Sequence, residues 1–306
     1  MPDRIAAIGE CMLELSGSND DSWRMGFAGD TLNTLWALRA LMPDTQCDYV
    51  TAFGDDEFSK RQIAFLRENG FGTAASPVIP GARPGLYAIT LDGVERSFTY
   101  WRSDSAAKQL ASNSDALDKS LENLRLAYVS GITLAILDAP ARATLLTALA
   151  KARAAGTVIA FDPNYRPRLW QSRDQAQREI NALLDIADIV LPTFPDEREL
   201  YGDTSPDVTL QRIRDAGVAE IVVKNGTDDA LVLFEGKVIE VPAVPAEAAV
   251  DTTGAGDAFN GGYLAARLMG MDGGSAARRA HQTAAAVVSV RGALAPFETL
   301  QAAFAA

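Results

Sequence analysis

Between residues 124 and 226 the sequence alternates short apolar runs with longer helical patterns. The apolar runs have the length of buried strands, and amphipathic stretches separate them. Parallel strands need a crossover between them, usually a helix, so this succession indicates a parallel sheet with helices on both faces. The predicted strands are 126–129, 157–161, 189–191 and 220–223, and the predicted helices are 140–155, 173–186 and 208–216.

The same type of pattern continues toward both ends of the chain. We find no internal repeat, charged tail or low-complexity linker, so we expect one α/β domain over residues 1–306. Ligands of such sheets bind beyond the carboxyl ends of the strands, where the polar clusters of this sequence lie. The further predicted strands are 5–8, 12–15 and 49–53, and the further helices are 34–41, 54–68, 258–269, 274–290 and 297–305.

Residues 85–102 depart from this alternation. Residues 86–91 and 96–102 each read as a strand, and Asp92-Gly93 between them is a hairpin signal. With the strand that begins at Met12, this hairpin would form a small sheet outside the α/β body. A two-stranded ribbon is only marginally stable by itself, so we expect the small sheet to cover another part of the protein.

Charge and composition exclude several classes of function. The formal net charge of −12 disfavours nucleic acid and anionic membranes as partners. His281 is the only histidine, which rules out a histidine-based triad or zinc site, and we expect it to be structural. Cys11 and Cys47 lie in apolar contexts and are expected to be buried thiols. No apolar run approaches ~20 residues and no signal peptide is evident, so we expect a cytoplasmic protein.

The sequence Asp-Thr-Thr-Gly-Ala-Gly-Asp at residues 251–257 precedes a helical pattern. A turn of bare backbone at a helix start offers N–H groups and the positive end of the helix dipole, which together suit a phosphate. Asp257 lies beside this anion site, where it is suited to take a proton from a hydroxyl that attacks phosphorus. A glycine turn capped by aspartates, without a ligand, is the alternative. Phe259 at the third glycine position argues against dinucleotide binding, and no P-loop motif is present.

This motif, followed by Ala-Phe, resembles the C-terminal signature of the phosphofructokinase-B/ribokinase family of sugar kinases. The resemblance implies a ribokinase-like three-layer fold with a mostly parallel central sheet and a small β-sheet lid formed from about residues 10–30 and 85–103. It also implies ATP and Mg²⁺ as cofactors. Asp257 would be the catalytic base, the turn Gly254, Ala255 and Gly256 would hold the transferred phosphate, and Thr252 would lie on the nucleotide side.

Residues 27–33 resemble the sugar-binding segment of that family, with Ala28 in place of the first of two glycines. The sequence Gly-Asp-Thr-Leu-Asn resembles one branch of the family in particular, the kinases of 2-keto-3-deoxygluconate. As an alternative, the polar residues of this segment are only turn and cap residues. The resemblance implies a substrate-binding role for Gly29, Asp30, Asn33, Tyr87, Tyr100, Arg102 and Ile132.

The segment Phe-Asp-Pro-Asn-Tyr-Arg-Pro-Arg-Leu-Trp at residues 161–170 resembles the same branch over its full length. By that resemblance Asn164 faces the nucleotide and Arg166 faces the substrate. Arginine binds a carboxylate bidentately, whereas a neutral sugar needs partners for hydroxyl groups. Arg102 and Arg166 at candidate site positions therefore favour a sugar acid in a protein of net charge −12.

Two further segments match the family less completely. Lys224-Asn225-Gly226 resembles the nucleotide loop of the family, which makes Lys224 and Gly226 candidate ATP contacts. Asp229 replaces a glycine of that loop, however, and Lys224 could equally be a surface lysine. Thr193 replaces the asparagine of an Asn-x-x-Glu motif near magnesium. Asp196 or Glu197 then either orients a magnesium-bound water or simply begins a helix, and no direct metal ligand is assigned.

The reaction implied by the resemblance is transfer of the ATP γ-phosphoryl group to a primary hydroxyl of 2-keto-3-deoxygluconate. Two alternatives remain open at the level of sequence. One is a kinase of a neutral sugar such as fructose or ribose, and the other is a non-catalytic sensor of a sugar acid or nucleotide. The sequence does not choose between the gluconate and galactonate series, and a homo-oligomer formed through the edges of the lid is a further expectation.

Overall fold

The computed structural model describes residues 4–17, 22–92, 95–246 and 248–306. Within these residues the larger sheet has nine strands. Seven of them pair in parallel, and the two at one edge, which come last in the chain, are added by antiparallel pairing. In spatial order the strands are β13 (Lys237–Val241), β12 (Ala230–Phe234), β11 (Glu220–Val223), β10 (Ile189–Val190), β9 (Val158–Asp162), β8 (Leu126–Ser130), β1 (Arg4–Ile8), β4 (Gln46–Val50) and β5 (Phe71–Gly72).

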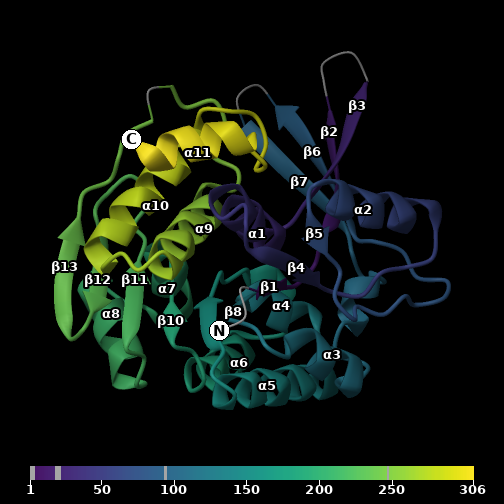
Figure 1. Cartoon of the computed structure of the whole chain (residues 1–306), viewed down its shortest axis with the longest axis horizontal. Coiled ribbons are helices and arrows are strands. Elements are labelled where there is room, and N and C mark those ends of the chain that lie inside the picture. Colours follow the sequence, from purple (N-terminus) through teal and green to yellow (C-terminus); the bar gives the residue numbers. More distant parts are fainter. Residues whose placement is uncertain (1–3, 18–21, 93–94, 247) are drawn as a thin grey trace.

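Helices cover both faces of this sheet (Figure 1). Along β1, Ile5 and Ala7 belong to one apolar cluster and Ala6 and Ile8 to another, and all four are fully buried. A strand buried on both faces is typical of the parallel sheet between two helical layers that the sequence predicts. The first cluster includes α1 (Asp30–Leu41), α2 (Glu57–Glu68), α9 (Ala255–Leu268), α10 (Gly273–Val288) and α11 (Phe297–Ala305). The second includes α3 (Ser114–Leu121), α4 (Gly131–Ile136), α5 (Ala139–Ala154), α6 (Arg173–Leu184), α7 (Phe194–Tyr201) and α8 (Pro206–Asp215).

A second, four-stranded sheet lies apart from the first (Figure 1). Its order is β3 (Trp23–Ala28), β2 (Met12–Gly17), β6 (Leu86–Asp92) and β7 (Glu95–Trp101). The predicted hairpin is present as β6 and β7, and β2 pairs with β6 in parallel. Strand β3 was not expected. Gly93 of the expected turn lies outside the described residues.

Two expectations near the N-terminus are wrong. Helix α1 begins at Asp30 rather than residue 34, because Gly29 is its N-cap, so Asp30 and Asn33 lie inside the helix rather than in a turn before it. Strand β4 covers Gln46–Val50 rather than residues 49–53, because its pairing with β1 ends at Val50. Apolar character continues beyond Val50, which explains the shifted prediction.

Four other segments also differ from expectation. Helix α4 begins at Gly131, directly after β8, where only a turn was expected. Strands β12 and β13 form an antiparallel hairpin at the sheet edge, where no strand was predicted. Helix α9 begins at Ala255, three residues before the predicted start. Helix α2 begins at Glu57, three residues after its predicted start, because Asp56 is its N-cap. The remaining predicted strands and helices agree with the structure within about two residues.

The predictions for the sulfur and imidazole groups are confirmed. Cys11 and Cys47 are buried thiols. His281 is buried, and its ring meets that of Phe259 edge-on at 5.0 Å, as expected for a structural residue. Among the described residues no helix is both long and apolar enough to span a membrane.

Candidate active site

A pocket of about 1050 Å³ brings together residues of the small sheet with helices and loops of the larger α/β body. It includes the loop after β9, the start of α9 and the inner residues of β6 and β7, as expected for a ligand site beyond the carboxyl ends of parallel strands. Of the predicted site residues, those that line it are Gly29, Asp30, Asn33, Tyr87, Tyr100, Arg102, Ile132, Asn164, Arg166, Gly254 and Asp257. Those that do not are Lys224, Gly226, Thr252, Ala255 and Gly256.

The glycine turn at the start of α9 is held in place by backbone geometry and by one carboxylate. Gly254 is the N-cap, with a φ of 76°, and a Cβ at this position would lie 2.5 Å from Cβ of Ala293. A side chain here would therefore be strained and would clash. Asp251 accepts hydrogen bonds from the backbone N–H groups of Thr253 at 2.9 Å and Gly292 at 2.7 Å. The turn thus presents a fixed helix N-terminus to the pocket, which suits an anion.

Asp257 lies in the first turn of α9 beside this N-terminus. Its Oδ2 accepts a hydrogen bond from Nδ2 of Asn33 at 2.8 Å, and its carbonyl oxygen accepts one from Oγ1 of Thr34 at 3.1 Å. Burial and the nearby carboxylates of Asp30 and Asp162 raise the pKa of Asp257 to about 7, against the opposing influence of Asn33 and Lys224. A carboxylate with a pKa near neutrality is suited to accept a proton and later release it.

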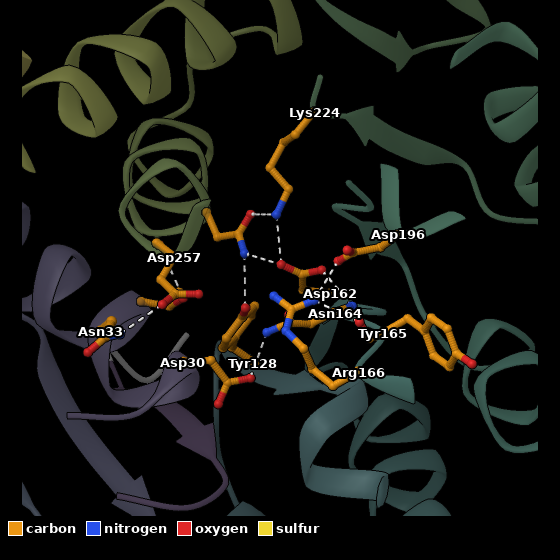
Figure 2. A network of polar contacts seen from close by, with 12 residues as sticks. Asp30, Asn33, Tyr128, Asp162, Asn164, Tyr165, Arg166, Asp196, Lys224 and Asp257 are labelled. Atoms are coloured by element: carbon orange, nitrogen blue, oxygen red, sulfur yellow. Dashed lines mark hydrogen bonds and ion pairs between the residues drawn. The ribbon is translucent and has the colours of Figure 1, made fainter. Parts of the chain in front are cut away.

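A hydrogen bond joins the segment that is predicted to bind the sugar to the segment that is predicted to bind the nucleotide. Nδ2 of Asn164, expected on the nucleotide side, donates to Oδ2 of Asp30, expected on the sugar side, at 3.0 Å (Figure 2). Asn164 has a φ of 36°, and its backbone N–H donates to Oδ1 of Asp162 at 3.0 Å. Burial raises the pKa of Asp30. Asn164 thereby fixes the carboxylate of Asp30 at the floor of the pocket.

Arg102 and Arg166, the two arginines predicted for the site, already pair with carboxylates of the chain. Arg102 donates to Glu10, whose residue is only 2% exposed, and Arg102 also lies 6.0 Å from the ring centroid of Tyr100. Nη1 of Arg166 donates to Oδ2 of Asp196 at 2.9 Å, although half of the Arg166 side chain is exposed. Sequence reasoning missed Glu10 as a partner. Its position immediately after a buried strand was the available signal.

Lys224 is buried, with 6% exposure, so its interpretation as a surface lysine is wrong. Its Nζ donates to Oδ2 of Asp162 at 2.7 Å and to Oδ1 of Asn260 at 2.9 Å (Figure 2). Nδ2 of Asn260 donates in turn to Asp162 Oδ2 at 2.7 Å and to the hydroxyl of Tyr128 at 3.0 Å. The sequence analysis did not single out Asp162, Asn260 or Tyr128. Asp162 follows a predicted strand and lies in the segment 161–170, but no role was assigned to it, and no quoted motif includes Asn260 or Tyr128.

Asp196 and Glu197 both lie in the first turn of α7, which confirms that they begin a helix. Asp196 faces Arg166, whereas Glu197 is buried and pairs with Arg212 of α8 at 2.6 Å. Burial raises the pKa of Glu197 to about 7. Glu197 thus belongs to the contact between α7 and α8, which leaves Asp196 as the candidate for a magnesium-bound water. The described residues contain no cluster of three or more side chains suited to hold a metal ion directly.

An open helix N-terminus, a carboxylate with a raised pKa beside it and a pocket lined by polar side chains define the site of a small-molecule phosphotransferase. The sequence profile of the pfkB family carbohydrate kinases matches residues 2–300. This chain belongs to that family and is a carbohydrate kinase.

Among curated relatives, the 2-dehydro-3-deoxygluconokinase of Dickeya dadantii is 44% identical, with 97% of this chain and 98% of the relative covered. The enzyme of the same name from Escherichia coli K12 is 42% identical, with coverage of 99% and 100%. The crystal structure of a PfkB protein from Polaromonas sp. JS666 has a TM-score of 0.85 at 25% identity and coverage of 98% and 99%. A putative ribokinase II from E. coli, in complex with ATP and Mg²⁺, has a TM-score of 0.85 at 23% identity, covering 99% of both chains. These structures confirm the ribokinase-like fold.

Proposed function

We propose that this chain transfers the γ-phosphoryl group of ATP to the primary hydroxyl of 2-keto-3-deoxygluconate, also called 2-dehydro-3-deoxygluconate. The observation that carries this proposal is Asp257 at the N-terminus of α9, in the same pocket as Arg102 and Arg166. The full-length similarity to kinases named for this substrate supports it. The open end of α9 fits the phosphates of ATP, because helix N-termini favour anions.

In the proposed reaction the substrate hydroxyl gives its proton to Asp257 while its oxygen attacks the γ-phosphorus. The bond between that phosphorus and the β–γ bridging oxygen breaks, and ADP leaves. Backbone N–H groups of Gly254, Ala255 and Gly256 stabilise the charge on the transferred group. Magnesium supplies charge neutralisation to the phosphates, and Asp196 would hold one of its waters.

Substrate contacts in this proposal come from the larger α/β body and from the small sheet. Gly29, Asp30 and Asn33 of the larger body face the sugar hydroxyls, with Ile132 beside them, while Tyr87, Tyr100 and Arg102 approach from the small sheet. The small sheet, with about residues 10–30 and 85–103, would act as the lid of a single kinase domain over residues 1–306. Asn164, Thr252 and Gly226 remain proposed nucleotide contacts.

Recognition of the acid is proposed to depend on the two arginines. The side chain of Arg166 is half exposed, and its guanidinium group uses only Nη1 in the bond to Asp196, so its other nitrogens remain for a carboxylate. Arg102 has 12% of its side chain exposed and is oriented by Glu10. A neutral sugar would leave both guanidinium groups without an added partner, which favours an acid.

The test is ADP release with Mg-ATP and a panel of 2-keto-3-deoxygluconate, its galactonate epimer, fructose, ribose and gluconate. Turnover limited to the two keto-deoxy acids supports the proposal, and their ratio gives the epimer preference. Turnover on fructose or ribose would keep the chemistry and overturn the substrate. A plant relative named probable fructokinase-7 is 34% identical over 71% of this chain, which justifies the neutral sugars in the panel.

The non-catalytic alternative has its own result in the same experiment. A sensor would bind the sugar acid or ATP in a calorimeter without releasing ADP. Asp257, held by Asn33 beside an intact glycine turn, favours the catalytic function, because a sensor has no need for a carboxylate poised near neutrality. We further propose a cytoplasmic location, on the basis of the ATP requirement and the buried thiols.

We also propose that the protein is a homo-oligomer joined through the small sheet at its edge strands, β3 and β7. Trp23 and Trp101 on this sheet are 48% and 59% exposed, and both line an apolar groove with Leu13, Leu15 and Phe58. Large exposed aromatic groups in one groove are typical of an interaction surface. Sedimentation of the wild type and of Trp101→Ser would test this proposal. A single monomeric species for both proteins would overturn it.

A further inference from the structure

The family resemblance assigns Lys224 to the nucleotide, but this role does not explain where the residue lies. It follows β11, is almost fully buried, and is absent from the lining of the pocket. A Cβ built on Gly256 would nevertheless lie 3.9 Å from its Nζ. The ammonium group is thus next to the glycine turn but does not line the pocket.

Three side chains hold this ammonium group at one place (Figure 2). Asp162 at the end of β9 and Asn260 of α9 both accept hydrogen bonds from Nζ, and the hydroxyl of Tyr128 on β8 accepts one from Asn260. Asp162 is 3% exposed, and Asn260 and Tyr128 are fully buried. Asn260 lies on the same helix as Asp257, one turn further along. This connection fixes the distance between the lysine and the candidate base.

The charged groups that face Asp257 come from four elements. From α1, Asp30 opposes its ionisation and Asn33 favours it by a hydrogen bond. From the end of β9, Asp162 opposes ionisation, and from the segment after β11, Lys224 favours it. Arg166 and the neutral Tyr128 complete the surroundings, while His281 of α10 contacts Phe259 instead.

We propose that Lys224 is a positioning residue of the reaction, which offsets the charge of Asp162 and so keeps Asp257 ionised as the general base. Without this cation, two buried carboxylates would face Asp257 and favour its protonated form. A protonated Asp257 cannot accept the hydroxyl proton. The buried pair acts as a unit: Asp162 fixes the backbone of Asn164 at the pocket, and Lys224 removes the electrostatic cost that Asp162 imposes on the base.

The experiment measures kcat/KM for the sugar substrate from pH 5.5 to 9 in wild type, Lys224→Met, Asp162→Asn and the double variant. The acid limb of this profile reports the pKa of the general base in the free enzyme. We expect Lys224→Met to shift the acid limb to higher pH by about one unit or more, and Asp162→Asn to shift it to lower pH. The double variant is expected to return close to the wild-type profile. Titration of ATP itself is common to all four proteins.

A merely structural role would give a different result. It would lower activity by the same factor at every pH, or move both single variants in the same direction, and either outcome overturns the proposal. If Lys224→Met does not fold because Asp162 is left unpaired, Asp162→Asn is compared with the double variant. The added Lys224→Met change must then raise the acid limb, and an unmoved limb overturns the proposal.

Asp48→Asn provides the matched control. Asp48 is 1% exposed and pairs with Arg4 at 2.5 Å, so the variant also breaks a buried ion pair of the large sheet, but away from the pocket. Its acid limb should coincide with that of the wild type.

The inference rests on the proposed function only through the assay. The titration of the Asp257 carboxyl carbon by NMR, assigned with Asp257→Asn, gives the same comparison without turnover. Absence of turnover in the wild type would therefore overturn the substrate proposal, whereas an unchanged Asp257 titration in Lys224→Met would overturn this one.

Discussion

Nδ2 of Asn33 donates a 2.8 Å hydrogen bond to Oδ2 of Asp257, although 224 positions separate the two residues in the chain. The bond joins the first turn of α1 to the first turn of α9. It connects the segment that resembles a sugar-binding region with the segment that resembles a phosphate-binding region. The candidate base is therefore oriented by a residue that also lines the pocket beside it.

This bond predicts a pH-dependent defect in Asn33→Ala. A hydrogen bond to a carboxylate favours its charged form, so its loss should raise the pKa of Asp257 above its present value of about 7. The base must be deprotonated to act, so kcat at saturating sugar should fall by roughly tenfold at pH 6 and much less at pH 9. Rates measured at the two pH values test this. If Asn33 served only as a sugar contact, its loss would lower the rate equally at both pH values. Asn69→Ala, at the end of α2, is the control.

Removal of the base itself is the second prediction. Asp257→Asn keeps the size of the side chain and a hydrogen-bonding group but cannot take a proton from the substrate. We expect kcat to fall by ~10²–10⁴ while the affinity for ATP changes little. Single-turnover kinetics and calorimetric titration with an ATP analogue separate the two quantities. Turnover close to that of the wild type would remove Asp257 from the role of base.

Arg166 is expected to separate the two substrates. Arg166→Ala removes a charged donor from the proposed sugar-acid side, and loss of such a hydrogen bond costs about 1.5–3 kcal/mol, or roughly 10- to 150-fold in affinity. The KM for 2-keto-3-deoxygluconate should rise by that factor, with little change for ATP. Arg153→Ala, which breaks a surface ion pair with Asp188, should change neither KM. An equal rise in KM for the sugar acid and for ATP would contradict the assignment of Arg166 to the sugar-acid side.

The pair between Arg102 and Glu10 predicts a change in stability. Arg102→Ala leaves a carboxylate of a residue that is only 2% exposed without its cation, and breaking a buried pair in this way costs about 3–5 kcal/mol. Urea unfolding at pH 8 measures the loss. Arg153→Ala, whose ion pair is exposed, should lose less than about 1 kcal/mol under the same conditions.

The same variant should recover stability at lower pH. Burial already raises the pKa of Glu10 in the wild-type protein, and loss of Arg102 should raise it further. Above its unfolded pKa the folded state then binds more protons than the unfolded state, so stability falls as pH rises and returns as Glu10 is protonated. The difference from wild type should therefore be smaller at pH 5 than at pH 8. A difference independent of pH would indicate lost packing rather than an unpaired charge.

Much of the architecture could be predicted because its signals are local. The apolar runs that became β8, β9 and β11 are short and bounded by polar turns, so their period and length identify them without tertiary information. The errors occur where pairing decides. Strand β4 ends at Val50 because its partner β1 ends at Ile8, and the sequence beyond Val50 remains as apolar as before.

The candidate site was predicted unevenly for a related reason. Asp257, Asn33 and Arg166 were found because each lies in a segment that resembles a family motif, and they line one pocket. Glu10, Asp162 and Asn260 were missed because each acts through a partner far along the chain. Asp162 and Asn260 are 98 positions apart and meet at 2.7 Å. Contacts of this kind leave no local pattern.

By itself the sequence determined the α/β class and the glycine turn with its adjacent aspartate, and its resemblance to a family suggested two arginines for an acid. These follow from periodicity, backbone freedom and side-chain chemistry, which are properties of short segments. Only the tertiary structure decided the charge state of the site. It buried Lys224 against Asp162 and paired Arg102 with Glu10 and Arg166 with Asp196. Electrostatic energies depend on distance and burial, and these are set when distant segments pack together.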